Sequence, residues 1–432
     1  MKIIVIPPEV ILLLYQMIKP ISISLSPNTE PDDVWRAFRL LWQPWKWGKG
    51  RAAEKLEKVF AERLGVQHAY SFNSGRSAFL AILDSLGLEN GPPAGGEVLL
   101  QAFTCNAVPN PVLWSGLTPV YVDCNKDDFN IDVQDLERKM TPKSKVVLVQ
   151  HTFGLAADMD RIMEICQKHN VILIEDCAHA LGATYKGKEV GTFGKAAFFS
   201  FSRDKVISCV YGGMAVTNDP DTAERIRQYH DKISYPSSYW IWQQLVHPVA
   251  MNWKILPTYG LFGKYLLVLF QKLHVLSKAV AAKEKWGEKP DYFPKCMPNA
   301  LALLALSQLE KLDRFNSHRK ELAIQYHSDL RDTSFLLPEQ FAERENIFLR
   351  FTVRHANAHN IIKKAWEQNI LLGDWYTSVL VPEGTDMVAM QYQKGSCPNA
   401  ERLAKTTLNL PTHINIREWQ YNKVIDFLRN AG

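Results

Sequence analysis

The chain shows two alternating patterns of apolar and polar residues. Residues 52–64 place apolar side chains at helical spacing and stop at Gly65, which predicts a helix. Beyond it, short runs rich in β-branched and aromatic residues alternate with helical stretches, at 68–72, 97–102, 119–123, 145–151, 171–176, 196–201 and 214–218. Strands that alternate with helices predict an α/β fold, with a mixed, mostly parallel seven-stranded sheet covered by helices.

The second half of the chain departs from this alternation. Residues 230–290 are dense in aromatic residues and prolines. After them, a helix from Pro298 through Leu309, a strand at 347–353 and a closing helix from Arg417 predict a smaller α+β domain. We therefore divide the chain into an N-terminal extension (1–50), a large domain (51–230), an aromatic-rich insertion (231–295) and a C-terminal small domain (296–432).

Composition and charge exclude several classes of protein. With 47% hydrophobic residues in 432, the chain can bury a large core. The 50 basic and 45 acidic residues are spread along it, so no nucleic-acid partner is expected. The seven cysteines include no CxxC pair, which indicates reduced thiols in a cytoplasmic protein without a metal site. Residues 1–6 look like the start of a signal sequence, but residues 7–9 (Pro-Pro-Glu) interrupt it, so secretion is not expected.

Two apolar strands end in residues that can carry chemistry. The run 171–176 ends in Glu175 and Asp176, and a carboxylate at the mouth of a sheet can keep a bound pyridine nitrogen protonated. The run 196–201 delivers the hydroxyl of Ser200 and, just beyond it, the amine of Lys205, which can form a Schiff base. Taken alone, Asp176 could equally cap a helix, and a lysine after a strand is more often a solvated surface residue.

A tight turn follows the first predicted strand. Residues 70–80 read as strand, turn and helix, with Ser74, Gly75, Arg76 and Ser77 at the turn. Free backbone N–H groups at the start of a helix form a natural phosphate site. The same short motif is also found as a simple helix cap, in which the glycine supplies an unusual backbone angle.

These motifs together resemble one family. The chain is similar to the DegT/StrS-type sugar aminotransferases in the ordered strings His151-Thr-Phe-Gly-Leu-Ala-Ala-Asp-Met-Asp, Ile174-Glu-Asp-Cys-Ala-His-Ala-Leu-Gly-Ala, and Phe199-Ser-Phe followed by Lys205 and Gly212-Gly213. The resemblance runs from about residue 48 to 412 and closes with Cys397-Pro-Asn-Ala-Glu and Leu408-Asn-Leu-Pro-Thr-His. It implies the fold of the aspartate aminotransferases, a homodimer, and pyridoxal 5'-phosphate (PLP) as the cofactor.

The resemblance also implies roles for individual residues. Lys205 would form the Schiff base and move protons, and Asp176 would pair with the ring nitrogen. His179 would lie beside the ring and its 3-oxygen. The phosphate would be bound by the turn that carries Ser74, Gly75 and Arg76, together with Ser200. An amino acid, usually glutamate in the family, would donate the amino group to a keto sugar on a nucleotide or lipid carrier, for a polysaccharide or another glycoconjugate.

Three departures from the family pattern change what can be carried over. In the family an aromatic residue stacks on the cofactor ring. Counting back from Gly116 places that position at Cys105 in this chain, so Phe103 would stack only if its loop shifts. The Asn and Arg that the neighbouring subunit supplies are replaced by a stretch in which Lys295 or Asn299 could substitute. These departures leave two alternatives open, a PLP enzyme that does not transaminate and a PLP-binding regulatory protein of the same fold. The third departure is Arg76, which replaces a threonine and could add a charged phosphate contact.

The aromatic insertion has two interpretations. Lysines interleave with a wide apolar surface along residues 261–278, which could be a helix at a membrane interface. No uncharged stretch approaches the ~20 residues of a membrane-spanning helix. We favour packing of the insertion over the active site or across a dimer interface, and keep peripheral membrane contact through residues 240–280 as the alternative.

Overall fold

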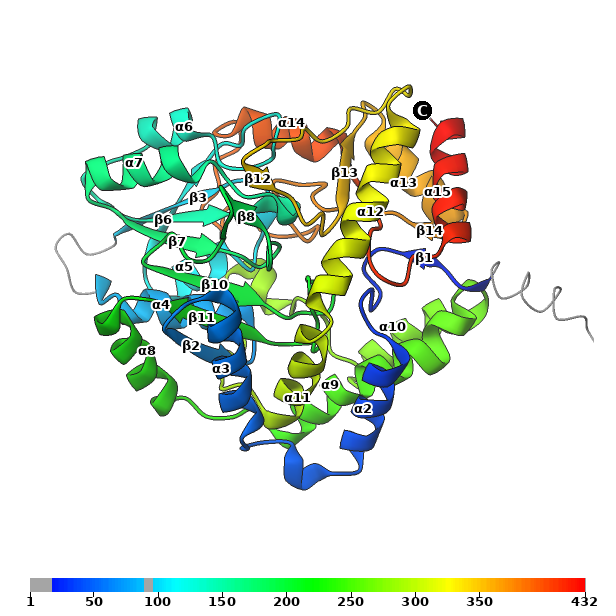
Figure 1. Cartoon of the computed structure of the whole chain (residues 1–432), viewed down its shortest axis with the longest axis horizontal. Coiled ribbons are helices and arrows are strands. Elements are labelled where there is room, and N and C mark those ends of the chain that lie inside the picture. The colour runs from blue at the N-terminus through cyan, green and yellow to red at the C-terminus, as the bar shows by residue number, and fades with distance from the viewer. Residues whose placement is uncertain (1–17, 89–95, 432) are drawn as a thin grey trace, which may run out of the picture.

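A seven-stranded sheet forms the centre of the protein (Figure 1). The computed structural model describes residues 18–88 and 96–431. The strands are β2 (His68–Phe72), β3 (Glu97–Gln101), β5 (Thr118–Val122), β6 (Ser144–Gln150), β7 (Ile172–Asp176), β10 (Ala196–Ser200) and β11 (Gly213–Thr217). Each strand agrees with its predicted run to within one residue at both ends. The predicted mixed sheet is therefore confirmed.

The strand order brings the carboxyl ends of the parallel strands together at one edge of the sheet. The order is β2-β11-β10-β7-β6-β3-β5, and β11 alone in this sheet runs antiparallel to its neighbours. The pairs β10–β7, β7–β6, β6–β3 and β3–β5 are all parallel. The carboxyl ends of these strands therefore meet along one edge, where open α/β sheets bind ligands.

Helices account for most of the remaining chain. They are α2 (Pro31–Leu41), α3 (Ala52–Leu64), α4 (Gly75–Ser85), α5 (Pro109–Trp114), α6 (Val133–Arg138), α7 (Met159–His169), α8 (Pro220–Lys232), α9 (Ser238–Ala250), α10 (Lys264–Lys272), α11 (Asn299–Leu309), α12 (Leu312–Leu330), α13 (Ala358–Glu367), α14 (Pro398–Thr406) and α15 (Glu418–Ala431). Short turns of 3-10 helix are η1 (Pro44–Lys46), η3 (Thr152–Gly154), η5 (Leu256–Thr258) and η7 (Lys283–Trp286), and the π-helical turns are η4 (Met251–Ile255) and η6 (Tyr259–Gly263). The predicted helix at residues 52–64 is confirmed as α3, which ends at Gly65 in a left-handed conformation.

Successive side chains of the central strands enter two different cores. In β6, Val147 and Val149 belong to an apolar cluster that also contains side chains of α3, α7 and α11. Val146 and Leu148 belong to a second cluster, which contains side chains of α4, α5 and α14. Because side chains alternate between the faces of a strand, a sheet covered on both faces needs apolar residues at every position. This explains the nearly continuous apolar runs in the sequence.

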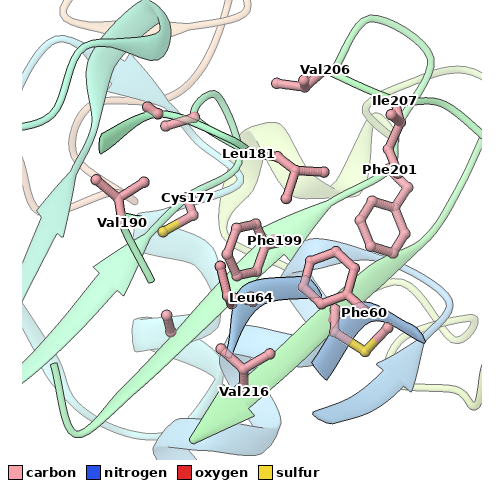
Figure 2. Packing of buried hydrophobic residues seen from close by; sticks show 14 of the residues in the cluster. Phe60, Leu64, Cys177, Leu181, Val190, Phe199, Phe201, Val206, Ile207 and Val216 are labelled. Atoms are coloured by element: carbon pink, nitrogen blue, oxygen red, sulfur yellow. The ribbon is translucent and has the colours of Figure 1, made fainter. Parts of the chain in front are cut away.

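The strand that leads to Lys205 is anchored in the first core. Figure 2 shows Phe199 of β10 against Phe60 of α3, and their ring centroids are 4.9 Å apart. Val206 and Ile207, which directly follow Lys205, are buried in the same cluster. The backbone on both sides of Lys205 is therefore held by core packing.

The C-terminal part has its own apolar core. Side chains of α12, α13 and α15 pack with the antiparallel pair β13 (Phe351–Arg354) and β16 (Thr407–Leu410). The N-terminal extension joins this core, because β1 (Ile21–Ser22) pairs with β14 (Ile370–Leu371) and Ile21 is buried there. The remaining short strands are β4 (Thr104–Cys105), β8 (Thr184–Tyr185), β9 (Lys188–Glu189), β12 (Arg344–Glu345) and β15 (Leu380–Val381). The division into four parts stays a prediction.

The aromatic insertion folds mainly as α9, the turns η4 to η6, and α10. A small apolar cluster that includes Met251, Ile255 and Leu276 holds these elements together. Among the described residues, no helix is long and apolar enough to cross a membrane. The N-terminal run that resembles a signal sequence lies outside the described residues.

Candidate active site

A cavity of about 290 Å³ lies at the carboxyl ends of the central strands. Three parts of the chain build its wall: the strand ends with the turn before α4, the insertion, and the loop that precedes β15. The lining includes Gly75, Arg76, Thr104, Cys105, Gln150, Asp176, His179, Ser200, Ser202, Asp204, Lys205, Ala279, Val280, Asp374, Trp375 and Tyr376. Six of the eight predicted site residues therefore meet in one cavity.

The two carboxylates at the end of β7 point in opposite directions. Glu175 is fully buried, and its oxygens accept hydrogen bonds from the backbone N–H groups of Gly191, Phe193 and Gly194. Despite its burial, these bonds and His151 hold the pKa of Glu175 below its usual value. Asp176, the next residue, faces the cavity instead. The period of two along a strand thus gives one structural carboxylate and one that is available to a ligand.

Asp176 is a buried acid that forms no ion pair with another described residue. Its side chain is 2% exposed and accepts one backbone N–H bond, from Ala178 at 2.9 Å. Burial raises the pKa of Asp176 to about 6, although the Ala178 bond and the charge of Lys205 act in the opposite direction. Burial favours the neutral acid unless a positive charge is brought next to it. A cationic ring nitrogen in the cavity would supply that charge.

Lys205 is presented by a loop with a fixed backbone. The side chain of Asn28 donates to the carbonyl of Lys205 at 2.5 Å, and the buried Arg319 donates to the carbonyl of Val206 at 2.8 Å. The Nζ atom of Lys205 lies 4.5 Å from the ring centroid of Trp375 and forms no ion pair within the described part of the chain. Burial lowers the pKa of Lys205, while Asp204, Cys105 and Asp176 oppose this effect. A lowered pKa favours the neutral, nucleophilic amine.

The turn before α4 is arranged as an anion site. The hydroxyl of Ser74 accepts a hydrogen bond from the N–H of Ser77 at 3.0 Å, so Ser74 caps the helix and does not line the cavity. Gly75 and Arg76 begin the helix and do line it. A Cβ atom at Gly75 would lie 3.0 Å from the Cβ of Ser200, so the glycine allows the end of β10 to approach closely. The helix N-terminus and the Ser200 hydroxyl fit a phosphate group.

Arg76 is not a free cation in this cavity. Its guanidinium forms an ion pair with the fully buried carboxylate of Glu284 and donates to the carbonyl of Ala279 at 3.0 Å. It also lies 4.7 Å from the ring centroid of Phe293. Arg76 therefore joins the turn before α4 to the insertion, and any contact of its side chain with a phosphate remains a prediction.

Phe103 is placed differently from the prediction. It has a φ of +63°, and its fully buried ring packs on Tyr376 and Phe129, with centroids 5.2 and 5.9 Å apart. The left-handed backbone turns Phe103 into the second core, so that Thr104 and Cys105 line the cavity instead. This placement contradicts the predicted contact between Phe103 and a cofactor ring.

His179 lies in a stack of aromatic rings at the cavity wall. Its ring is parallel to that of Trp375 within 20°, with centroids 5.1 Å apart. The Nε2 atom of His179 is 3.4 Å from the hydroxyl of Tyr376. Burial and the nearby charges of Lys205 and Arg350 hold the pKa of His179 well below its usual value, so the ring is neutral.

Several cavity residues were not predicted. Gln150 ends β6, so the same rule of polar strand ends that singled out Asp176 could have found it. Trp375 lies in a loop whose sequence has no pattern that predicts a place in the cavity. The two residues proposed to replace partner groups lie outside the cavity: Lys295 binds the hydroxyl of Ser234, and Asn299 binds the backbone of Lys46 and Ala52.

A second cavity of about 520 Å³ adjoins the first. The two share the lining residues Asp204, Ala279, Val280 and Pro382. The second is also lined by the cationic side chains of Arg203, Lys278 and Lys285, and by His247, whose pKa is held well below its usual value by burial. The Nε of Arg203 and the Nδ1 of His247 have no hydrogen-bond partner among the described residues. Burial lowers the pKa of Arg203, which indicates a cation that is not fully compensated.

Comparisons with known proteins identify relatives along most of the chain. The model of the DegT/DnrJ/EryC1/StrS aminotransferase family matches residues 32–256 and 267–429. A GDP-perosamine synthase of Caulobacter vibrioides is 40% identical over 197 residues, which are 45% of this chain and 52% of that protein. A GDP-perosamine synthase of Escherichia coli O157:H7 is 28% identical over 85% of this chain and 86% of its own length. The crystal structure of S. venezuelae DesV in complex with a ketimine intermediate matches 93% of this chain and 94% of that one, with 27% identity and a TM-score of 0.70.

Proposed function

Because the chain belongs to the DegT/DnrJ/EryC1/StrS aminotransferase family, we propose that it transfers an amino group from an amino acid to a keto sugar. Aminotransferases of this family depend on PLP. The observation that carries the proposal is the meeting of Asp176, Lys205 and the start of α4 in one cavity. These are an acid for a ring nitrogen, an amine for a carbonyl and a site for a phosphate.

The residues of the first cavity fit PLP. Asp176 would bind the ring nitrogen, because a cation there would stabilise its buried carboxylate. The phosphate would lie at Gly75 and the N–H groups that begin α4, within reach of the Ser200 and Ser202 hydroxyls. His179 would contact the ring as a neutral imidazole. When bound, PLP supplies the electron sink on which amino-group transfer depends.

Lys205 performs the proton transfers in this proposal. Its amine would hold the cofactor between turnovers and would be free while the donor amino acid is bound. The free Nζ then takes a proton from the donor carbon and later returns one to the acceptor carbon. The lowered pKa of Lys205 suits both steps, because a general base must be partly neutral at the working pH. Core packing and the bond from Asn28 keep this loop in place.

The second cavity supports an acceptor that carries phosphate groups. Arg203 and Lys278 line it, and it shares Asp204 with the first cavity. Two relatives are named as GDP-perosamine synthases, and that name contains a nucleotide-linked sugar. We therefore propose a nucleotide-linked keto sugar as the acceptor, with its diphosphate in the second cavity and its keto carbon toward Lys205. Glutamate is the first donor to test.

An absorption experiment tests the proposed function. The purified protein with PLP is expected to show the visible band of a lysine-linked cofactor, and glutamate should convert this band to that of the amino form. Lys205→Ala should lack the visible band, whereas Lys405→Ala, which changes an exposed lysine on α14, should behave as the wild type. A band that does not depend on Lys205 would refute the assigned role. A lysine-dependent band that no amino acid changes would favour a PLP protein without transamination.

A further inference from the structure

The helix α10 presents an apolar stripe to solvent. Leu261, Phe262, Tyr265, Val268, Leu269 and Leu273 are each between 48% and 65% exposed. Their spacing puts them on one side of the helix that η6 and α10 form. The opposite side contributes Leu266, Leu267 and Phe270 to the small core of the insertion. Exposed apolar side chains in such a continuous stripe indicate a partner surface.

A second group of exposed aromatic residues lies beside this stripe. Trp35 and Phe38 of α2 contact Trp253 of η4, with ring centroids 5.2 and 5.1 Å apart. Trp42 extends this group, with its ring centroid 6.3 Å from that of Phe38, and is 72% exposed. The turn η4 packs against η6 and α10, so it connects the two groups. We call the two groups together the aromatic face; Figure 1 shows α2 and α10 on the same side of the molecule.

The charge around the aromatic face is mainly positive. Residues 34–53 and 232–283 contain no Asp or Glu, but they contain several lysines and arginines. Of these, Arg36, Arg39, Lys254, Lys264 and Lys272 are exposed. None of these five forms an ion pair within the described part of the chain. The surface is therefore apolar and aromatic with a mainly basic rim, and the exposed Asp32 at the start of α2 is paired with Lys311.

We propose that the aromatic face binds the surface of a lipid bilayer that contains anionic phospholipids. Tryptophan and tyrosine favour the membrane interface, and lysine stems can extend along the apolar layer while their charges reach the headgroups. A second copy of the chain is a poor partner, because a two-fold interface would bring the same basic rims together. Anionic headgroups supply the opposite charge.

Two further observations support this face as a membrane contact. Residues 1–17, which lie outside the described part, have a mostly apolar sequence and join the chain at Ile18. The Ile18 carbonyl accepts a hydrogen bond from Asn369, and a Cβ at Gly260 would lie only 2.9 Å from that carbonyl oxygen, so Ile18 lies next to η6. The family model also leaves residues 257–266, the start of the stripe, unmatched.

The position of the second cavity links this surface to the proposed acceptor site. Leu267 and Gln271, on the inner side of α10, line that cavity. Membrane binding would therefore bring the acceptor site close to the lipid surface.

Vesicle sedimentation with the full-length, PLP-loaded protein tests the proposal. Binding to vesicles of phosphatidylcholine with phosphatidylglycerol should exceed binding to pure phosphatidylcholine by about tenfold or more, and should weaken as salt is added. The triple variant Phe262→Ser/Tyr265→Ser/Leu269→Gln and the charge variant Lys264→Glu/Lys272→Glu should each reduce this binding by about tenfold or more. The control Ile324→Ser/Val388→Ser changes apolar residues elsewhere that are even more exposed, and it should not affect binding.

Two outcomes would overturn the proposal. The first is wild-type protein that does not bind the anionic vesicles, or that binds both kinds of vesicle equally. The second is a triple variant that becomes monomeric by light scattering while the wild type is a dimer, because the face would then be covered by a second copy. The absorption band of the bound cofactor shows that each variant is folded. All the substituted residues are on the outer surface, away from both cavities.

Discussion

Replacing Asp176 by Asn should stabilise the cofactor-free protein at neutral pH. The folded protein has an Asp176 pKa of about 6, compared with the ordinary value of 3.8. The folded state therefore binds this proton more tightly than the unfolded state, so stability is lost as the pH rises from about 4 to about 6. A shift of about two units corresponds to ~3 kcal/mol. Asp176→Asn removes this loss, so the free energy of unfolding of the variant should exceed that of the wild type by up to ~3 kcal/mol at about pH 7.

Urea unfolding of the cofactor-free proteins between about pH 4 and pH 7.5 measures this difference. The two proteins should converge near pH 4, where Asp176 is protonated in both states, and diverge as the pH rises. Glu175→Gln is the matched control: its carboxylate accepts three backbone N–H bonds, so the change should destabilise the protein at neutral pH. Asp176→Asn should also abolish transamination. A variant that is less stable than the wild type at neutral pH would refute the reasoning.

Three further predictions concern the cavity walls. Glu284→Gln leaves Arg76 buried without its counter-charge and should lower the free energy of unfolding in urea by about 3–5 kcal/mol. The double variant with Arg76→Met should lose less than the sum of the two single variants. Losses that simply add would contradict a direct pair. Gly75→Ala should weaken PLP binding by about tenfold or more in a fluorescence titration, because its Cβ would press on Ser200, which belongs to the proposed phosphate site. Gly48→Ala, in open space, should have no effect. Arg203→Gln should raise the KM for a nucleotide-linked acceptor by about tenfold and leave the half-reaction with glutamate unchanged. If only the half-reaction with glutamate changed, Arg203 would act in the first cavity instead.

The fold could be predicted because its strands are buried on both faces. Val146 to Val149 of β6 and Ala196 to Phe199 of β10 each enter one core or the other, so these runs stand out in the sequence. A polar residue at the end of such a run lies at the sheet edge, which is why Asp176 and the Lys205 loop could be selected as candidates, and both line the cavity. No comparable rule applied to Phe103, because a positive φ at a residue other than glycine has no sequence signal.

The contact between Arg76 and Glu284 could also not be predicted from the sequence. The two residues are 208 positions apart and meet only because the insertion folds back over the cavity. We favoured an insertion that packs over the active site or across a dimer interface. Residues 279–280 do line the cavity, whereas the outer side of α10 faces solvent. The insertion therefore has one part in the cavity wall and another part in solvent, and its composition alone could not distinguish the two.

The bonds that hold the Lys205 loop have a consequence for biosynthesis. Asn28 lies near the start of the chain, whereas Arg319 belongs to α12, and the two side chains bind each other as well as the loop. During translation, the strands around Lys205 emerge well before residue 319 does. The amine of Lys205 therefore acquires its final position only after about three quarters of the polypeptide has left the ribosome. The nascent large domain, even if its sheet has formed, lacks a completed Lys205 loop.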